Sequence, residues 1–323
     1  MDETKQTTQQ SDAGLQEQIN LMEKKNKKLF HIALALMGVM IIFIILYLVT
    51  KSIIFMVIIM AFFAADAIMI FLASNSSRKT AIFIKENVTR FVLSEVFTVE
   101  EYKPKASFSK KQIKEAALVN GWNTFNGNDY FKGKYKGRGI EFSDIHLEYV
   151  RTKKEKNGNE TEIRETVFKG PWIILQHEGE LTEPLRVMEK RYLSYSQKKE
   201  EFAREFAETI LMKKDEEIET ESVEFNKQFQ IFGKDGHIAF YVLTPNFMEY
   251  LQAADKKAQG TTLLRFEHNS VTIAVHNEHN FFESNSGGRR GTVEAMRRAW
   301  RAELKYLTDI LDELLQNDYL FKK

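Results

Sequence analysis

The sequence predicts an α+β protein that begins with a pair of transmembrane helices, and three observations support this class. Two apolar runs, 29–50 and 53–73, lie close together near the N-terminus. Segments with alternating apolar and polar residues follow them, which is the pattern of β-strands. Helical spacing returns between these segments and in a long amphipathic stretch at the end of the sequence. Antiparallel hairpins mixed with helices are typical of α+β domains.

Each apolar run has roughly the 20 residues that a helix needs to cross the hydrocarbon core of a bilayer. Both runs are apolar on all sides, so a soluble fold would have to surround both helices with apolar partners. A cleaved signal peptide is disfavoured because a second run follows after two residues, with no small-residue cleavage site between them. The pattern therefore predicts a transmembrane hairpin, with the lipid bilayer as a partner.

The charges beside the two runs predict how the hairpin is oriented. Lysines precede the first run, at Lys24, Lys25, Lys27 and Lys28, whereas the turn between the runs carries only Lys51. Basic residues also follow the second run, at Arg78, Lys79, Lys85 and Arg90. The positive-inside rule therefore places both termini in the cytoplasm of a multi-pass protein of the cell membrane. We expect a polar cytoplasmic tail over 1–28, the hairpin over 29–73, and a cytoplasmic α+β domain over 74–323.

Helices are expected on both sides of the hairpin. Residues 1–20 are polar and are interpreted as a tail, with a helix that begins near Leu15. A polar break at 74–77 is expected to end the second span, and apolar residues over 82–96 then return at helical spacing. Ser109 is a suitable N-cap for a further helix that ends at Gly121.

The rest of the domain alternates between strand and helix patterns. Strands are expected over 140–149 and 163–175, with Asn157-Gly158 as a hairpin signal, and over 225–232 and 237–243, with a turn between them. A third hairpin is expected from 263–266 and 271–275. Helices are expected at 195–210, from Thr244-Pro245 onward, and over 291–320.

Asp66 is the most unusual residue of the second apolar run, because a carboxyl group inside a membrane is costly. One interpretation is an assembly contact or a proton-linked site. The other is an Asp that is hydrogen-bonded to the first span or lies near the inner interface. The sequence leaves both open.

Two arginines form a candidate anion site. Arg289 and Arg290 precede a helix whose N-terminal end disfavours positive charge, and three more arginines follow within three turns. Such a cluster suits a lipid head group, a phosphate or an acidic partner segment. The alternative is a solvated basic face paired with Glu294 and Glu303. With Lys24, Lys25, Lys27 and Lys28, these arginines are the candidate anion or lipid contacts.

Other patterns do not indicate a known chemistry. The glycines over 133–139 lack the Gly-Lys-Ser/Thr of a phosphate loop and precede a strand pattern, which favours a tight turn. His276 and His279 have no third ligand signalled nearby, so no metal or cofactor is expected. The chain has no cysteine and no G-x-S-x-G motif, and its net charge of +1 gives no reason to expect nucleic acid. Nothing points to an enzyme, and no catalytic residue is assigned.

The order of several short motifs resembles a known family. They are Asp129-Tyr-Phe-Lys-Gly-Lys-Tyr-Lys-Gly137, Ile140-Glu-Phe-Ser-Asp-Ile-His-Leu147, Val167-Phe-Lys-Gly-Pro-Trp172, Val223-Glu-Phe-Asn-Lys-Gln-Phe-Gln-Ile-Phe232 and Tyr241-Val-Leu-Thr-Pro-Asn-Phe-Met248. Together they resemble the bacterial membrane-protein family catalogued as domain-of-unknown-function 3137, over roughly residues 20–285. The resemblance implies two spans before a strand-rich domain, and it supplies no activity or catalytic residues.

Three functions are compatible with these features. The first is a membrane-anchored cytoplasmic binding or scaffold protein, which implies a protein partner or a second copy at the membrane. The second is an enzyme that acts on a membrane-associated substrate. The third is an oligomeric transport component, which rests on Asp66 alone.

Overall fold

The computed structural model describes residues 2–154, 160–179, 181–192, 216–258, 260–283, 285–286 and 289–321, with side chains at 2–11, 285–286 and 289–290 left aside. The chain divides into two compact units. Unit 1 comprises Met1–Thr89 and Ser284–Arg297, and unit 2 comprises Arg90–Glu283 and Arg298–Lys323. Each unit is described by itself.

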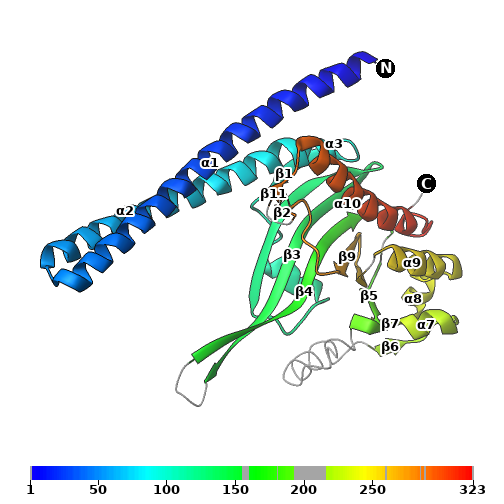
Figure 1. Cartoon of the computed structure of the whole chain (residues 1–323). Helices are drawn as coiled ribbons and strands as arrows, with labels where there is room; N and C mark the ends of the chain where they lie inside the picture. Colours follow the sequence, from blue (N-terminus) through cyan, green and yellow to red (C-terminus); the bar gives the residue numbers. More distant parts are fainter. Residues whose placement is uncertain are drawn as a thin grey trace. The chain divides into compact units, whose positions relative to one another are not determined.

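Unit 1 is built on two long helices, α1 (Asp2–Thr50) and α2 (Ile53–Ile84), which form a helical hairpin (Figure 1). Both are long and apolar enough to cross a membrane, as the sequence predicted. Lys51 makes the tight turn between them with a positive φ of 55°. A π-helical turn, η1 (Lys85–Thr89), and a two-stranded β10 (Asn285–Ser286) and β11 (Arg289–Arg290) complete the unit.

Two expected boundaries in unit 1 are wrong. Helix α1 begins at Asp2 rather than near Leu15, and α2 continues through the serines of 74–77. Both helices continue beyond the apolar runs, and they still contact each other just past the ends of those runs. Asn26 and Thr80, for example, meet across the two helices in a hydrogen bond of 3.1 Å. Such contacts between polar side chains were invisible to a pattern search for apolar residues.

Unit 2 contains an antiparallel sheet with nine strands among the described residues (Figure 1). The strands are β1 (Thr98–Lys103), β2 (Thr124–Tyr135), β3 (Arg138–Lys154), β4 (Glu160–Gln176), β5 (Leu185–Glu189), β6 (Glu216–Ile218), β7 (Phe229–Gly233), β8 (Thr261–Phe266) and β9 (Ser270–His276). Their order across the sheet is β1-β2-β3-β4-β9-β8-β5-β7-β6. The first four strands are neighbours in sequence, whereas the second half of the sheet interleaves distant segments.

The helices of unit 2 connect and cover these strands. They are α3 (Arg90–Ser94), α4 (Lys110–Ala116), α7 (Val223–Gln228), α8 (Gly236–Val242) and α9 (Pro245–Ala258). The long helix α10 (Val293–Leu314) begins in unit 1 and has its residues from Arg298 onward in unit 2. The α+β class is therefore confirmed, although α10 ends six residues before the expected Leu320.

Several local predictions are confirmed. Ser109 caps α4 with a capping box that it shares with Gln112. The Thr244 hydroxyl accepts a hydrogen bond from the Phe247 N–H at the start of α9. Strands β8 and β9 form the expected hairpin. Each of these signals acts over a few residues, so tertiary packing had little opportunity to override it.

The hairpin expected from 225–232 and 237–243 is wrong. Residues 223–228 form α7, and 236–242 form α8, which begins where the Asp235 carboxylate accepts from the His237 N–H. Strand β7 is flanked by β5 and β6, so neither edge is left for a partner from 237–243. The expected helix at 195–210 and the Asn157-Gly158 turn lie outside the described residues.

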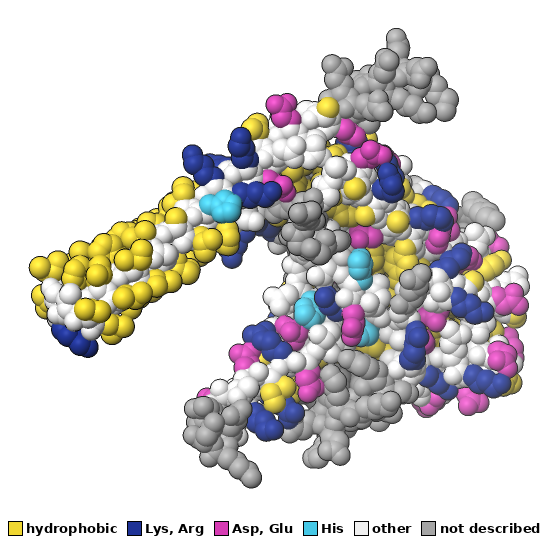
Figure 2. Space-filling model, in the orientation of Figure 1, with side chains coloured by type: hydrophobic (Ala, Val, Ile, Leu, Met, Phe, Trp, Pro, Cys, Tyr) yellow, Lys and Arg dark blue, Asp and Glu magenta, His cyan; other side chains and the backbone are white. Residues whose placement is uncertain are grey.

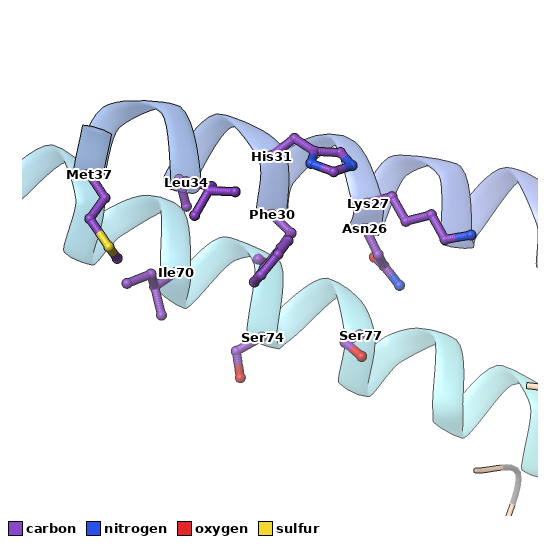
Figure 3. Close-up of a pocket in the computed structure, with 11 residues that line it drawn as sticks. Asn26, Lys27, Phe30, His31, Leu34, Met37, Ile70, Ser74 and Ser77 are labelled. Carbon is purple, nitrogen blue, oxygen red and sulfur yellow. The ribbon is translucent and has the colours of Figure 1, made fainter. Parts of the chain in front are cut away.

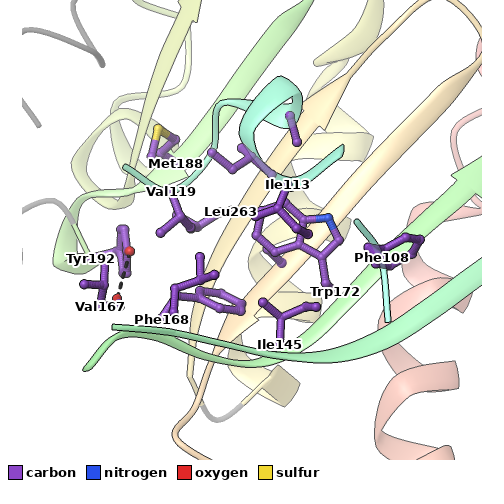
Figure 4. Close-up of a cluster of buried hydrophobic side chains, with 14 of the residues drawn as sticks. Phe108, Ile113, Val119, Ile145, Val167, Phe168, Trp172, Met188, Tyr192 and Leu263 are labelled. Atoms are coloured by element: carbon purple, nitrogen blue, oxygen red, sulfur yellow. Dashed lines mark hydrogen bonds between the residues drawn. The ribbon is translucent and has the colours of Figure 1, made fainter. Parts of the chain in front are cut away.

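Large apolar side chains fill both faces of the sheet in unit 2. On one face, Trp172 and Phe168 meet edge to face at 5.5 Å within a cluster that includes Ile113 of α4 (Figure 4). The Tyr192 hydroxyl at the edge of this cluster donates to the Val167 carbonyl at 3.0 Å. On the other face, Phe131 and Phe142 lie under Leu304 and neighbouring leucines of α10.

Candidate functional site

The contact between α1 and α2 follows a heptad pattern, which the sequence analysis did not detect. The helix positions that face each other are called the seam here. On α1 they are Met22, Asn26, Leu29, Ala33, Leu36, Met40, Phe43 and Tyr47, all buried or half-buried. On α2 they are Phe55, Ile59, Phe62, Asp66, Met69, Ala73, Ser76 and Thr80. Alternating steps of three and four residues are typical of a coiled coil.

Outside the seam, the hairpin exposes large apolar side chains. Phe63 is 67% exposed and Phe71 is 68% exposed. Figure 2 shows hydrophobic side chains covering the part of the hairpin that lies toward the turn. An apolar surface this extensive is unfavourable in water, whereas lipid tails are a suitable solvent for it. The hairpin is therefore compatible with membrane association.

Asp66 lies on the seam and faces α1 rather than the surroundings of the hairpin. It is only 6% exposed, and its Oδ1 atom has no hydrogen-bond partner among the described residues. The neighbouring seam positions, Phe62 and Met69, are apolar. Asp66 is thus a buried polar group within an otherwise apolar part of the seam. The assembly and proton-linked roles considered for it remain predictions.

A polar layer lies further along the seam, toward the ends of the apolar runs. The Asn26 amide donates to the Thr80 hydroxyl at 3.1 Å, and that hydroxyl donates to the Ser76 carbonyl at 3.0 Å. The Asn26 Oδ1 atom is buried without a hydrogen-bond partner among the described residues. Asn26 and Thr80 both fall on the seam spacing, but the packing of the two helices decides that they face each other.

A groove of about 790 Å³ runs beside this layer, between α1 and α2 (Figure 3). Its lining changes from apolar to polar along the hairpin. The apolar part consists of Phe30, Ala33, Leu34, Met37, Ile70 and Ala73, and the polar part of Asn26, Lys27, His31, Ser74 and Ser77. The small seam residues Ala33 and Ala73 leave space that the larger flanking side chains border.

The four lysines predicted as anion or lipid contacts differ in their position relative to the groove. All are exposed on α1, but only Lys27 lines the groove, whereas Lys24, Lys25 and Lys28 do not. Lys27 is followed within four residues by His31, which also lines the groove. One cationic side chain is therefore placed at the polar end of a mainly apolar groove.

The predicted arginine site is only partly described. The backbones of Arg289 and Arg290 pair with Ser286 and Asn285 in the β10–β11 hairpin, and their side chains lie outside the described residues. Arg297 is 5% exposed and forms an ion pair with Asp12 of α1, at 2.6 Å between Nη1 and Oδ1. The anion-binding role of Arg289 and Arg290 stays a prediction.

The other arginine partners in this region differ from those expected. Within unit 2, Arg301 binds both carboxylate oxygens of Glu95 at 2.7 Å. Glu303, which was expected to pair with an arginine, instead accepts from the Phe282 N–H at 2.8 Å and contacts His279 at 3.0 Å. Burial raises the pKa of Glu303, and these contacts oppose that shift.

The histidines and glycines of unit 2 have local roles. His276 Nδ1 accepts from the Lys169 N–H at 3.0 Å, whereas His279 turns to Glu303, so the two rings have different partners. No group of three or more candidate metal ligands occurs among the described residues. Lys136 and Gly137, with φ of 48° and 84°, form the tight turn between β2 and β3 that the glycines over 133–139 predicted.

A buried acid pair in unit 2 was missed by sequence reasoning. Glu189 of β5 and Asp255 of α9 are 5% and 6% exposed, and their carboxyl groups are close enough to affect each other's charge. Glu189 also accepts from the Thr262 N–H at 3.1 Å, and Gln228 donates to Asp255 at 2.7 Å. Burial and the neighbouring Asp255 raise the pKa of Glu189 to about 7. The two acids are far apart in sequence, so no local pattern could reveal the pair.

Comparison with known proteins gives one family match. No curated protein matches the chain. A crystal structure of the mycobacterial trehalose monomycolate transport factor A, TtfA, aligns with 72% of this chain and 95% of its own, at 10% identity and a TM-score of 0.36. That similarity is too low to carry an argument.

The family match begins and ends later than the motifs suggested. A family model described as a protein of unknown function (DUF3137) matches residues 166–316. The motifs before residue 166 therefore lie outside the match, and all of α10 lies within it. Over residues 166–316 the chain matches the DUF3137 family, which confirms the family that the order of its motifs indicated.

Proposed function

We propose that the chain is a membrane-anchored binding or scaffold protein that holds unit 2 on the cytoplasmic side. The observation that carries this proposal is the hairpin, whose outer surface is apolar while its buried seam contains Asn26, Asp66 and Thr80. The outer surface of a water-soluble helical pair would instead be mostly polar. A bilayer is the environment in which an apolar outer surface is stable.

The charge distribution supports the orientation. Because Asn26 contacts Thr80, the lysines at 24–28 and the basic residues Arg78 and Lys79 lie at the same end of the hairpin. The other end, at the turn, carries Lys51. Basic residues concentrate on the cytoplasmic side of membrane proteins, so the turn is expected outside and both termini inside.

The described side chains of unit 2 favour binding over catalysis. Its polar cavity, about 280 Å³ beside the β2–β3 turn, is lined by charged and amide groups that include Lys132, Glu141 and Gln176. Lys132 and Glu141 are 3.8 Å apart and face each other as an ion pair. The acid pair of Glu189 and Asp255 does not line this cavity. These groups suit polar recognition of a partner.

The orientation is tested by labelling single cysteines in intact cells with a membrane-impermeant thiol reagent. Because the chain has no cysteine, Ser52→Cys at the turn and Lys153→Cys in unit 2 each give a clean signal. We expect Ser52→Cys to label in intact cells and Lys153→Cys to label only after permeabilisation. Labelling of Lys153→Cys in intact cells would show that unit 2 faces outward. Recovery of the chain in the soluble fraction would overturn the anchoring itself.

The binding role needs a separate experiment. The full chain, with an affinity tag, is cross-linked in native membranes and purified, with cells that express the untagged chain as the control. We expect enrichment of a specific protein or of a second copy of the chain. If nothing is enriched over the control, the scaffold role fails while the anchoring stands. Enrichment of ring-like oligomers that depend on Asp66 would favour the transport alternative instead.

A further inference from the structure

We propose that the groove between α1 and α2 binds one anionic phospholipid, with its phosphate at Lys27 and one acyl chain along the apolar part. This inference rests on the proposed membrane anchoring and adds a ligand to it. It rests on three features of the groove. The groove is a defined cavity, its lining changes from apolar to polar along the hairpin, and Lys27 places a positive charge at its polar end.

The apolar part of the groove fits a hydrocarbon chain. Phe30, Leu34 and Met37 border it on α1, and each remains at least 40% exposed in spite of its size. Ile70 borders it on α2 and is 52% exposed. From Phe30 to Met37 the helix rises by about 10 Å, which accommodates the upper part of an acyl chain. An acyl chain in this position would cover side chains that no other described element of unit 1 covers.

The polar part of the groove fits a phosphate-bearing head group. Lys27 supplies a positive charge, and Ser74 on the opposite helix supplies a hydroxyl. The buried Asn26 Oδ1, which has no partner among the described residues, requires a hydrogen-bond donor. A head-group hydroxyl or ammonium would provide that donor. A charge-assisted contact with phosphate is roughly twice as strong as a neutral one.

The position of the groove along the hairpin agrees with this ligand. The apolar runs begin at Leu29 and end at Ala73, so Lys27 and Ser74 lie just beyond their limits. The groove therefore crosses the level at which a bilayer changes from hydrocarbon to head groups. Free phosphate would reach only the polar end and leave the apolar part uncovered. A lipid would occupy both parts at once.

The test measures lipid binding to the purified full chain by native mass spectrometry, with phosphatidylglycerol and phosphatidylcholine as probes. We expect one phosphatidylglycerol per chain to bind about tenfold more tightly than phosphatidylcholine, because the quaternary ammonium of phosphatidylcholine offsets the phosphate charge that Lys27 would attract. Lys27→Gln is expected to remove this preference. Lys28→Gln makes the same charge change at the next residue, which does not line the groove, and is expected to change binding less than twofold.

A second pair of variants tests whether the lipid lies in the groove. Ser74→Trp places a large side chain in the groove, whereas Asn75→Trp adds the same side chain at an exposed position of α2 outside it. We expect Ser74→Trp to weaken lipid binding at least fivefold and Asn75→Trp to leave it unchanged. Circular dichroism of each variant checks that the helices are intact, and Lys27→Gln keeps the test valid if Ser74→Trp unfolds.

Three outcomes would overturn the proposal. Equal losses in Lys27→Gln and Lys28→Gln would show that a diffuse basic surface attracts the lipid. Unchanged binding in Ser74→Trp would show that the lipid lies elsewhere. Full displacement of the lipid by inorganic phosphate would show that only the head-group charge is recognised. The cysteine-labelling pattern of Lys27→Gln separates this result from the anchoring: if labelling is as expected but binding is not, only the groove assignment fails.

Discussion

The hairpin of unit 1 and the sheet of unit 2 place their apolar and polar side chains in opposite ways. In the hairpin, Phe63 is 67% exposed while the carboxyl of Asp66 is 6% exposed. In unit 2, Trp172 is 1% exposed, and charged side chains cover the two-stranded ribbon that β3 and β4 form beyond the sheet. Exposed apolar side chains are stable against lipid tails, whereas exposed charged side chains are stable in water. The kind of side chain that a surface exposes therefore indicates whether that surface suits lipid or water.

The comparison predicts that removing a large aromatic side chain has a large effect on stability in unit 2 and a small one in unit 1. Trp172→Ala leaves a cavity between the sheet and α4, so we expect it to lower the free energy of unfolding by about 4 kcal/mol. Phe63→Ala removes a side chain that faces outward and should change it by less than about 0.5 kcal/mol. Chemical denaturation of the full chain in detergent, followed by tryptophan fluorescence for unit 2 and by helical circular dichroism for the hairpin, measures both. Similar losses of unfolding free energy in the two variants would contradict the difference described between the two units.

A second prediction concerns the buried acid of unit 2 and its dependence on pH. The folded state raises the pKa of Glu189 from 4.5 to about 7, so folding favours the protonated acid. The corresponding stabilisation is full below pH 4.5 and is lost as the pH rises through about 7. Its size is at most about 3 kcal/mol. Glu189→Gln, which stays neutral, should therefore be more stable than the parent at pH 8 and similar to it at pH 4.5.

Unfolding curves of both proteins at several pH values measure this difference. The matched control is Glu249→Gln, which changes an exposed glutamate of α9 and should follow the parent at every pH. A Glu189→Gln variant that is less stable than the parent at pH 8 would mean that the charged form of Glu189 is held by its ion pair with Arg191.

The smallest expected effect concerns the buried acid of the hairpin. Asp66→Leu replaces a carboxyl group with an apolar side chain on a seam that is apolar on both sides of it. We expect the hairpin to gain about 1–2 kcal/mol, because a polar group in a membrane helix is costly. Titration of the full chain with dodecyl sulfate, followed by helical circular dichroism, measures it. Asp66→Asn is the control and should gain less.

A loss of stability in Asp66→Leu would contradict this prediction and would point to a different role for the carboxyl group. It would show that Asp66 has a partner in the membrane, such as a second copy of the hairpin. The assembly interpretation of Asp66 would then be favoured over that of an internal polar residue.

The candidate site was only partly readable from the sequence. Lys27 and Asp66 were visible because charged residues beside or within an apolar run are conspicuous. The groove was not, because it depends on the small size of Ala33 and Ala73 at facing positions of two helices. Nor was the pairing of Glu189 with Asp255, which depends on how α9 packs against β5. The type of each residue can be read from the sequence, but which distant residues come close together in space cannot.

The sequence by itself determined the elements whose signals are local. These are the two apolar spans, the capped starts of α4 and α9, the β8–β9 hairpin and the amphipathic pattern of α10. Only the tertiary structure decided the order of the nine strands, the helical state of 223–228 and 236–242, and the seam of the hairpin. Local hydrogen bonds and periodicity act within a few residues. Strand neighbours and seam contacts are selected by the packing of segments that lie far apart in the chain.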